Sequence, residues 1–247
     1  MSPDEARPRL AALGFDPEDV EVLAAHFLAA EERGLAGHGL ARIEWLETWS
    51  ELHPDAEPAR VVAEPGYERW DGTDVLGYLT LDAVVEAQLA NPPEHARVVV
   101  CGRTFPTGML GYWTRRLAEG GLVAALTATS PRRLAHPDGG EPLAGTNPLS
   151  IAIPSSDGVP VVVDASMASV NYGDVLAGRA TMDEVVPFGG DKAHKAFALA
   201  VGLQLLVDAL TPDDGYGAVL LVARPESDPV PALRELAAGV RLPGDRG

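Results

Sequence analysis

Two short segments of the chain combine residue types that transfer protons and bind anions. The first is Gly37-His38-Gly39-Leu40-Ala41-Arg42, in which a histidine lies between two glycines and an arginine follows four residues later. An imidazole can donate a proton near neutral pH, and a guanidinium can hold a carboxylate through two hydrogen bonds. We expect His38 at an open helix start with Arg42 one turn on. The alternative is a glycine-rich turn that carries a surface histidine.

The second segment lies at the start of the last long predicted helix. It reads Pro187-Phe188-Gly189-Gly190-Asp191-Lys192-Ala193-His194-Lys195. Glycines, the free amides of a helix N-terminus and two lysines suit a phosphate or pyrophosphate. The alternative is a helix cap with solvated lysines.

Other general motifs are missing from the sequence. It has no phosphate loop ending in Gly-Lys-Ser/Thr, no GxGxxG after a first strand, no GxSxG and no HExxH. The six histidines lack metal-ligand spacing, so we expect no metal site. Cys101 ends a predicted buried strand and is interpreted as a core residue rather than a nucleophile.

Composition restricts the classes of protein. The 247 residues are 46% hydrophobic and 22% charged, which is typical of a folded protein. A formal net charge of −17 argues against nucleic-acid or anionic-membrane partners. The N-terminal segment does not resemble a secretory signal, and the apolar stretch 196–207 is interrupted by Gly202 and Gln204. We expect a cytoplasmic protein with no membrane segment.

Hydrophobic periodicity, caps and breakers predict a mixed α and β fold. Helices are expected between the Ser2 cap and Gly14, between the Asp16 cap and Gly34, and over 40–52, 79–90, 107–119, 192–210 and 231–240. Strands are expected over 60–63, 96–101, 122–128, 149–153, 159–164 and 218–223. The run of valines in 159–164 suggests burial on both faces.

Seven segments resemble, in order, the motifs of the malate/L-lactate dehydrogenase type 2 family, which includes sulfolactate and ureidoglycolate dehydrogenases and Δ1-piperideine-2-carboxylate reductase. The matching segments are GHGLAR from Gly37, DG from Asp71, GMLGYW from Gly108, LAGTNP from Leu143, VDASMA from Val163, HKAFALA from His194 and LPGDR from Leu242. They span nearly the whole chain.

The resemblance implies a fold and a chemistry. Family members have a non-Rossmann fold, form intertwined homodimers, and transfer hydride between NADH or NADPH and a small 2-oxo acid or cyclic imino acid. For this chain it implies a strand-rich cofactor domain over 71–189 and a mainly helical domain built from 1–70 and 190–247.

The resemblance also assigns site residues. His38 is the expected proton donor and Arg42 the expected carboxylate ligand. The expected cofactor contacts are Asp164, Ser166, Met167, Lys195, Ala196, Pro243, Gly244 and Asp245.

The sequence departs from the family pattern in four respects. Pro106 stands where some members have a catalytic histidine, and Gly37 replaces the serine before the motif histidine. Ala196 and Ala198 replace glycines that approach the cofactor. The chain is also shorter than family members, with losses between residues 168 and 189 and between 210 and 242. His194 is a candidate to replace the histidine missing at Pro106.

Three functions follow. The first is an NAD(P)H-dependent reductase of a small 2-oxo or 2-imino acid. The second is a non-redox enzyme on the same scaffold, such as a cyclase or isomerase. The third is a non-catalytic binding protein.

Overall fold

The computed structural model describes residues 1–211 and 215–245. The helices are α1 (Pro3–Ala12), α2 (Pro17–Glu32), α3 (Ala41–Leu46), α4 (Gly77–Ala90), α5 (Leu110–Glu119), α6 (Tyr172–Leu176), α7 (Ala193–Leu210) and α8 (Val230–Ala237), with 3-10 turns at Ala36–His38, Met182–Glu184 and Gly190–Lys192. The strands are β1 (Ala59–Glu64), β2 (Tyr67–Asp71), β3 (Ala96–Gly102), β4 (Val123–Ala128), β5 (Leu149–Ile153), β6 (Val161–Ala165) and β7 (Ala218–Ala223).

The seven strands form one sheet in the order β1-β2-β3-β7-β4-β5-β6. Only β2 and β3 are parallel, and every other neighbouring pair is antiparallel. This topology differs from the parallel doubly wound sheet of a Rossmann domain. The predicted mixed α and β, non-Rossmann fold is confirmed.

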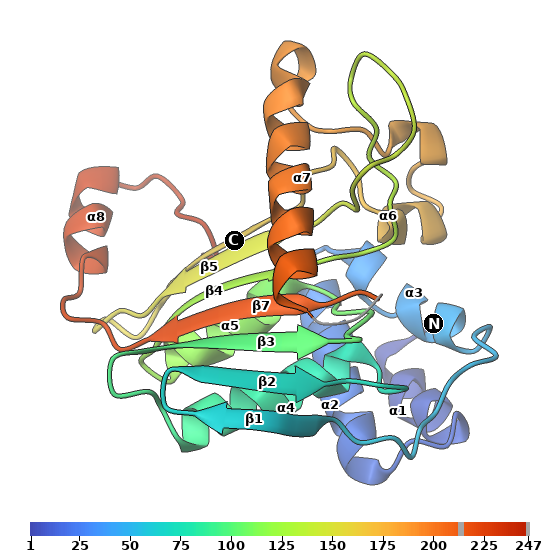
Figure 1. Ribbon diagram of the computed structural model, residues 1–247, viewed down its shortest axis with the longest axis horizontal. Coiled ribbons are helices and arrows are strands. Elements are labelled where there is room, and N and C mark those ends of the chain that lie inside the picture. The colour runs from blue at the N-terminus through green and yellow to red at the C-terminus, as the bar shows by residue number, and fades with distance from the viewer. Residues whose placement is uncertain (212–214, 246–247) are drawn as a thin grey trace.

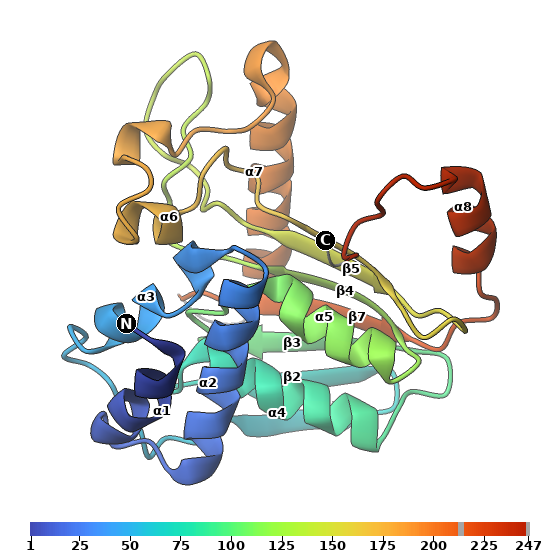
Figure 2. The ribbon, with the colours of Figure 1, turned by 180° about the vertical axis from the view of Figure 1, so that it is seen from behind.

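The two faces of the sheet differ in what covers them. Helices α2, α4 and α5 cover one face (Figure 2), and the main core lies between them and the sheet. Leu220 and Val222 of β7 point into this core, where Trp113 and Leu117 of α5 are fully buried. Helix α7 stands on the other face, and α8 lies beyond one end of the sheet (Figure 1).

The face that carries α7 also presents an apolar row. Strand pairing places Val98, Leu221, Ala125, Ile151 and Val163 side by side across five strands. Leu221 is 43% exposed, and Ile151 and Val163 are exposed as well. The expectation that the valine run of 159–164 is buried on both faces is therefore wrong, because β6 is an edge strand with one open face.

Strand β2 was not predicted from the sequence, because its inward positions do not follow the usual apolar pattern. Glu68 is buried beside Trp70, with the neighbouring positions half-buried. Its carboxylate accepts hydrogen bonds from Trp70 Nε1 at 3.0 Å and Gln88 Nε2 at 2.9 Å, and lies 3.2 Å from Arg97 Nη1. These partners compensate the cost of burying a charge, and the sequence pattern does not reveal them.

Several predicted boundaries also change. The helix predicted over 40–52 ends at Leu46, and the helix predicted over 107–119 begins at Leu110. Helix α6 was not predicted, although Asn171 caps it by accepting a hydrogen bond from Asp174 N at 3.0 Å. The other predicted helices and strands are present, with ends that differ by a few residues.

The division into two domains stays a prediction. The sheet takes β1 and β7 from the segments 1–70 and 190–247, which were assigned to the helical part. The segment Gly190–Leu210 is long and apolar enough to cross a membrane by length and composition, with a mean hydropathy of 1.4. Within the protein it contacts β4 and β7, and its Gln204 is buried and hydrogen-bonded to Asn147 at 3.0 Å.

Candidate active site

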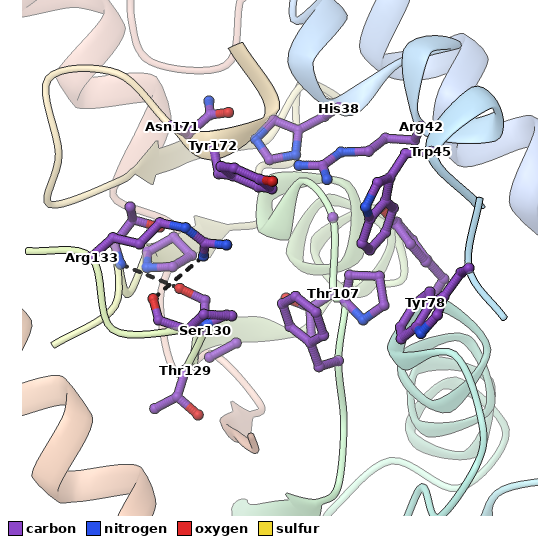
Figure 3. A pocket seen from close by; sticks show the side chains of 18 of the residues that line it. His38, Arg42, Trp45, Tyr78, Thr107, Thr129, Ser130, Arg133, Asn171 and Tyr172 are labelled. Carbon is purple, nitrogen blue, oxygen red and sulfur yellow. Dashed lines mark hydrogen bonds between the residues drawn. The ribbon is translucent and has the colours of Figure 1, made fainter. Parts of the chain in front are cut away.

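A cavity of about 400 Å³ opens between the His38–Arg42 segment, the loop after β3, the loop after β4 and the start of α6 (Figure 3). His38 and Arg42 line it on one side, and Ser130 and Arg133 line it on the other. None of its lining residues, all of which belong to the described part of the chain, is acidic. The cavity therefore favours an anionic ligand in a protein whose overall charge is strongly negative.

Arg42 is held so that part of its guanidinium faces the cavity. The side chain is buried, and its Nε donates to the carbonyl oxygen of Gly37 at 2.8 Å. Across the described residues this is the one hydrogen bond that its side chain makes, which leaves the terminal nitrogens as donors for a ligand. The geometry suits a bidentate carboxylate contact.

Glycines make this arrangement possible. A Cβ atom on Gly37 would lie 2.7 Å from the backbone N of Asp174, and one on Gly173 would lie 2.7 Å from Arg42 Nη2. A Cβ on Gly39 would overlap the carboxylate of Glu31, which accepts a hydrogen bond from Leu40 N at 2.8 Å. Gly37, the departure from the family's serine, is thus explained by the close approach of α6.

His38 is half-buried, and its ring lies beside the Arg42 guanidinium (Figure 3). The Nδ1 atom is buried and has no hydrogen-bond partner among the described residues. The surrounding protein and the positive charge of Arg42 lower the pKa of His38 to about 3. The imidazole is therefore neutral at pH 7. A bound carboxylate would offset the charge of Arg42 and so raise this pKa.

A second histidine lies behind the cavity wall. His26 is fully buried, accepts a hydrogen bond from Met109 N through Nε2 at 3.0 Å, and stacks on Trp113 at a centroid distance of 5.3 Å. Burial lowers its pKa to about 3. Tyr78 packs edge-on against it at 4.9 Å, and a Cβ on Gly108 would overlap both rings. His26 is a structural residue in this arrangement.

Most residues of the cavity wall were not predicted from the sequence. Trp45, Trp49 and Phe105 form an aromatic side, and the Arg133 guanidinium lies 3.9 Å from the centroid of the Tyr172 ring. Trp45 follows Arg42 by three residues within α3, a spacing that returns to the same side of a helix, but Trp49 lies beyond the end of α3 at Leu46, where helical spacing gives no signal. Arg133 and Tyr172 lie in loops and at a short helix without a recognisable motif.

Pro106 also lines the cavity, at the position where some family members have a histidine. His194 is exposed in the first turn of α7 and is not among the residues that line this cavity. The side chain of Tyr78 is buried at the wall, and its hydroxyl has no hydrogen-bond partner among the described residues. Cys101 is fully buried, and burial raises its pKa to about 12, as expected for a core thiol.

Three expected cofactor residues lie at the end of β6. Ser166 Oγ and Met167 N both contact the carbonyl oxygen of Thr146, at 3.4 and 2.9 Å, and Thr146 lines the cavity. Met167 itself is buried. Asp164 Oδ2 accepts a hydrogen bond from Gly111 N at 2.6 Å. Asp164 keeps accessible surface, and the protein atoms around its carboxyl group raise its pKa to about 6.

The C-terminal segment reaches the opposite end of the same strand. Pro243 O accepts a hydrogen bond from Val162 N at 3.0 Å, and Gly244 O accepts one from Arg115 Nη2 at 2.7 Å. Gly244 and Asp245 line a separate cavity of about 500 Å³ together with Arg115. Arg246 of the LPGDR motif lies outside the described residues.

Lys195 and Ala196 are not brought to this edge. Lys195 is exposed on α7, and Ala196 is buried on the other side of the same helix. Further along α7, Ala200 O and Gln204 Oε1 accept hydrogen bonds from Asn147 Nδ2, each at 3.0 Å. The middle of α7 therefore fixes the loop that carries Thr146.

The chain is similar in sequence to known dehydrogenases and reductases. Residues 4–187 match the family model described as malate/L-lactate dehydrogenase. The chain is 30% identical over 223 residues to (2R)-3-sulfolactate dehydrogenase (NADP(+)) from Chromohalobacter salexigens, covering 82% of this chain and 67% of that protein. It is 31% identical over 180 residues to 2,3-diketo-L-gulonate reductase from Escherichia coli, covering 69% of this chain and 53% of that enzyme.

Solved structures share the fold. Delta1-piperideine-2-carboxylate reductase from Pseudomonas syringae pvar. tomato superposes with a TM-score of 0.83 at 23% identity, covering 99% of this chain and 89% of the other. Sulfolactate dehydrogenase from Methanocaldococcus jannaschii gives a TM-score of 0.75 at 18% identity, covering 96% and 82%. With the family model matching about three quarters of the sequence, this chain belongs to the malate/L-lactate dehydrogenase family.

Proposed function

We propose that the protein is an NADH- or NADPH-dependent reductase of a small 2-oxo acid or cyclic 2-imino acid. The observation that carries this proposal is the pair His38 and Arg42, which share one side of an anion-favouring cavity. The relatives named above are two dehydrogenases and two reductases of small acids. The chain spans between about half and two thirds of the length of the two relatives compared by sequence, so the activity of the whole enzyme is part of the proposal.

The edge formed by β6 and α5 fits a nicotinamide dinucleotide. Val162 to Ser166 is about 13 Å of extended chain, and it joins the cavity near Arg115 to the cavity near Thr146. Backbone approaches are close at both ends, because a Cβ on Gly244 would lie 2.8 Å from Val162 N and one on Gly111 would lie 2.9 Å from Asp164 Oδ2.

The donor set along this edge suits the parts of a dinucleotide. Arg115 would hold a phosphate, Asp245 would hold ribose hydroxyls, and Asp164, Ser166 and Met167 would flank the nicotinamide end. A bound cofactor supplies the hydride. Lys195 and Ala196 enter this proposal as weaker, outer contacts, since they lie on α7 away from β6.

Arg42 and His38 perform the remaining chemistry. Arg42 binds the substrate carboxylate and thereby fixes the adjacent carbonyl or imine carbon beside His38. His38 donates its hydrogen to the oxygen or nitrogen on which negative charge develops. Neutralisation of Arg42 by the carboxylate removes one of the two causes that lower the pKa of His38 and so favours protonation of the imidazole when substrate is bound. In the oxidation direction the neutral imidazole accepts the proton.

The homodimer that the family resemblance implies is supported by exposed apolar surface. Besides the row on the sheet, Leu205 on α7 is 61% exposed and Leu236 on α8 is 84% exposed. A patch of this kind marks an interaction site in soluble proteins. We expect light scattering to give the dimer mass, and Leu221→Asp to give the monomer. A monomeric wild-type protein would contradict this part of the proposal.

The cellular location proposed is the cytoplasm, in keeping with enzymes that use the nicotinamide pool. The buried Gln204 and its hydrogen bonds support α7 as a helix of a soluble protein rather than a membrane span.

The test combines cofactor titration with turnover. Calorimetry with NADH and with NADPH is expected to give a micromolar Kd for at least one of them, and a panel of 2-oxo and cyclic imino acids is expected to oxidise the bound cofactor. Arg42→Ala should lower kcat/KM by about a hundredfold through the loss of charge-assisted hydrogen bonds, with Arg42→Lys intermediate. Absence of binding of either cofactor at millimolar concentration would exclude the reductase and leave the non-redox scaffold or binding protein.

A further inference from the structure

An aromatic wall extends away from the proposed carboxylate ligand. The Arg42 guanidinium lies 5.3 Å from the centroid of the Trp45 ring, and the Trp45 and Trp49 rings are 5.0 Å apart. Phe105 follows Trp49 at 6.4 Å, and Tyr216 follows Phe105 at 4.8 Å. Four rings thus form a continuous surface that begins at Arg42.

Trp45 and Trp49 pack against the main core with part of their surface and leave the rest accessible. Trp45, Trp49 and Phe105 are each half-buried, and all three line the cavity that contains His38. Residues that merely complete a core are normally buried, as Trp113 is in this protein. Three large aromatic side chains that keep accessible surface inside one cavity indicate a binding surface for an apolar or aromatic group.

The wall continues into a second cavity. Trp49 and Phe105 also line a cavity of about 580 Å³ that contains Tyr216, so the two cavities meet at these rings. A ligand anchored on Arg42 can therefore extend past Trp49 towards Tyr216. The available length exceeds what a three-carbon acid such as pyruvate would occupy.

The direction of the wall follows from the carboxylate position. When Arg42 holds the carboxylate and His38 faces the neighbouring carbon, the remaining substituent of a 2-oxo acid is its side chain. Trp45 lies directly beside Arg42, and it offers the side chain an aromatic face rather than a charged or hydrogen-bonding group. Burial of a polar side chain there would leave its hydrogen bonds unmade.

We propose that the substrate carries an aromatic side chain, which stacks along Trp45, Trp49 and Phe105 while its carboxylate binds Arg42. This inference rests on the proposed function, and it identifies the substrate class as aryl-substituted 2-oxo acids or their cyclic imine counterparts. Trp49 is the specificity-determining residue, because it lines both cavities and, among the described residues, makes ring contacts with Trp45 and Phe105 but none with Arg42 or His38.

Arg133 suggests a second class of substrate. This second guanidinium lies across the cavity from Arg42, and it would favour a dicarboxylate such as oxaloacetate (Figure 3). Arg133 is already stacked on Tyr172 at 3.9 Å and donates from Nη1 to Pro131 O at 3.4 Å. We assign it to the cavity wall, and the dicarboxylate becomes an outcome of the test.

The experiment compares kcat/KM for phenylpyruvate, indole-3-pyruvate, pyruvate and oxaloacetate. The aromatic acids are expected to exceed pyruvate by at least about tenfold. Trp49→Ala should remove about tenfold of this preference, mainly by raising KM for the aromatic acids. Trp49→Phe should restore most of it. Tyr67→Ala, which removes a half-buried aromatic residue of β2 outside all three cavities, is the matched control and should change nothing.

Failure of this inference and failure of the proposed function give different results. Turnover of pyruvate or oxaloacetate at least equal to that of the aromatic acids would overturn the inference and leave the reductase intact. If no nicotinamide cofactor binds, calorimetry with 3-phenylpropanoate and indole-3-propanoate still tests the wall. Binding that weakens about tenfold in Trp49→Ala but not in Tyr67→Ala supports it, and no binding of either acid overturns it.

Discussion

The two parts of the proposed site are built in different ways. Around Arg42, Gly37 and Gly173 allow the 3-10 turn, α3 and α6 to approach so closely that a single Cβ would collide with backbone or guanidinium atoms. Along β6 and the C-terminal segment, the expected cofactor residues are spread over the length of a strand, and all but the buried Met167 are accessible or only partly enclosed. Substrate geometry is therefore fixed by local packing, whereas cofactor binding depends on several separate, individually weaker contacts.

This difference predicts which region of the chain tolerates substitutions. The segment that carries His38 and Arg42 is closely packed against α6. The glycine at position 37, where the family pattern has a serine, fits this close packing. The segment between residues 210 and 242, in contrast, carries α8, and the exposed Leu236 of α8 and Leu205 of α7 lie on the surface for which a second copy of the chain is the proposed cover. Variants should therefore have large effects in the first region and graded effects in the second.

The largest effect is expected for His38→Ala. Loss of the group that moves the proton should lower kcat by about a thousandfold, which corresponds to about 4 kcal/mol of transition-state stabilisation. Cofactor Kd should change little, because His38 acts on the substrate. Steady-state kinetics and calorimetry measure the two quantities, and His194→Ala is the matched control with unchanged turnover. A fall in kcat of less than about threefold would contradict the assignment of His38 as the proton donor.

The next effect concerns stability and contrasts two glycines. Gly173→Ala should lower the free energy of unfolding by about 2–3 kcal/mol, since its Cβ would overlap the Gly37 carbonyl and crowd Arg42. Gly202→Ala lies in α7 with open space around it and should raise stability by up to about 1 kcal/mol through helix propensity. Urea unfolding measures both, and equal effects would remove the contrast between the regions.

A smaller effect is expected for Lys195→Ala. The ammonium group is exposed on α7, so its attraction for a cofactor phosphate is screened by water and salt. We expect the Kd of the preferred cofactor to rise by about threefold to tenfold with kcat preserved, and the effect to shrink at high salt. A large fall in kcat would instead show that Lys195 takes part in the reaction itself and would place the start of α7 in the catalytic site.

The smallest effect is expected for Asp164→Asn. The pKa of Asp164 is raised to about 6 from 3.8, so the folded state favours the protonated carboxyl. The stability that this preference contributes is complete below 3.8 and is lost as the pH rises through about 6. The variant should therefore match the wild type at about pH 4 and exceed it by up to about 1 kcal/mol at about pH 8, because partial exposure screens the charge.

The check is urea unfolding of both proteins at the two pH values. An asparagine oxygen can still accept the hydrogen bond from Gly111 N, so the difference isolates the charge. A stability difference between the two proteins that does not vary with pH would contradict the raised pKa.

Much of the fold could be predicted from sequence because its helices carry caps and its central strands carry apolar runs. Pro3 and Pro17 at helix starts and the run Val98-Val99-Val100 are examples of such local signals. Strand β2 could not be predicted, because the burial of Glu68 is compensated by Gln88 and Arg97 from other elements.

The candidate site also contains residues that could be predicted from the sequence and residues that could not. The spacing of His38 and Arg42 indicated their shared position, because both lie in one local segment. Trp49, Phe105 and Tyr216 meet only through the folding of three distant segments, and Arg133 and Tyr172 meet between two loops. No local pattern encodes these contacts, so the aromatic wall and the far side of the cavity emerged from the structure alone.

We propose that hydride transfer takes place in the cavity beside His38 and Arg42. The most direct test uses NADH and NADPH deuterated at the reactive ring carbon, with an accepted 2-oxo acid and mass spectrometry of the hydroxy acid formed. We predict that deuterium appears on the carbon that carried the oxo group with the wild-type protein, and that His38→Ala binds the cofactor but transfers about a thousandfold more slowly. Tight cofactor binding without deuterium in any product, or equal transfer by the His38→Ala variant, would contradict the account.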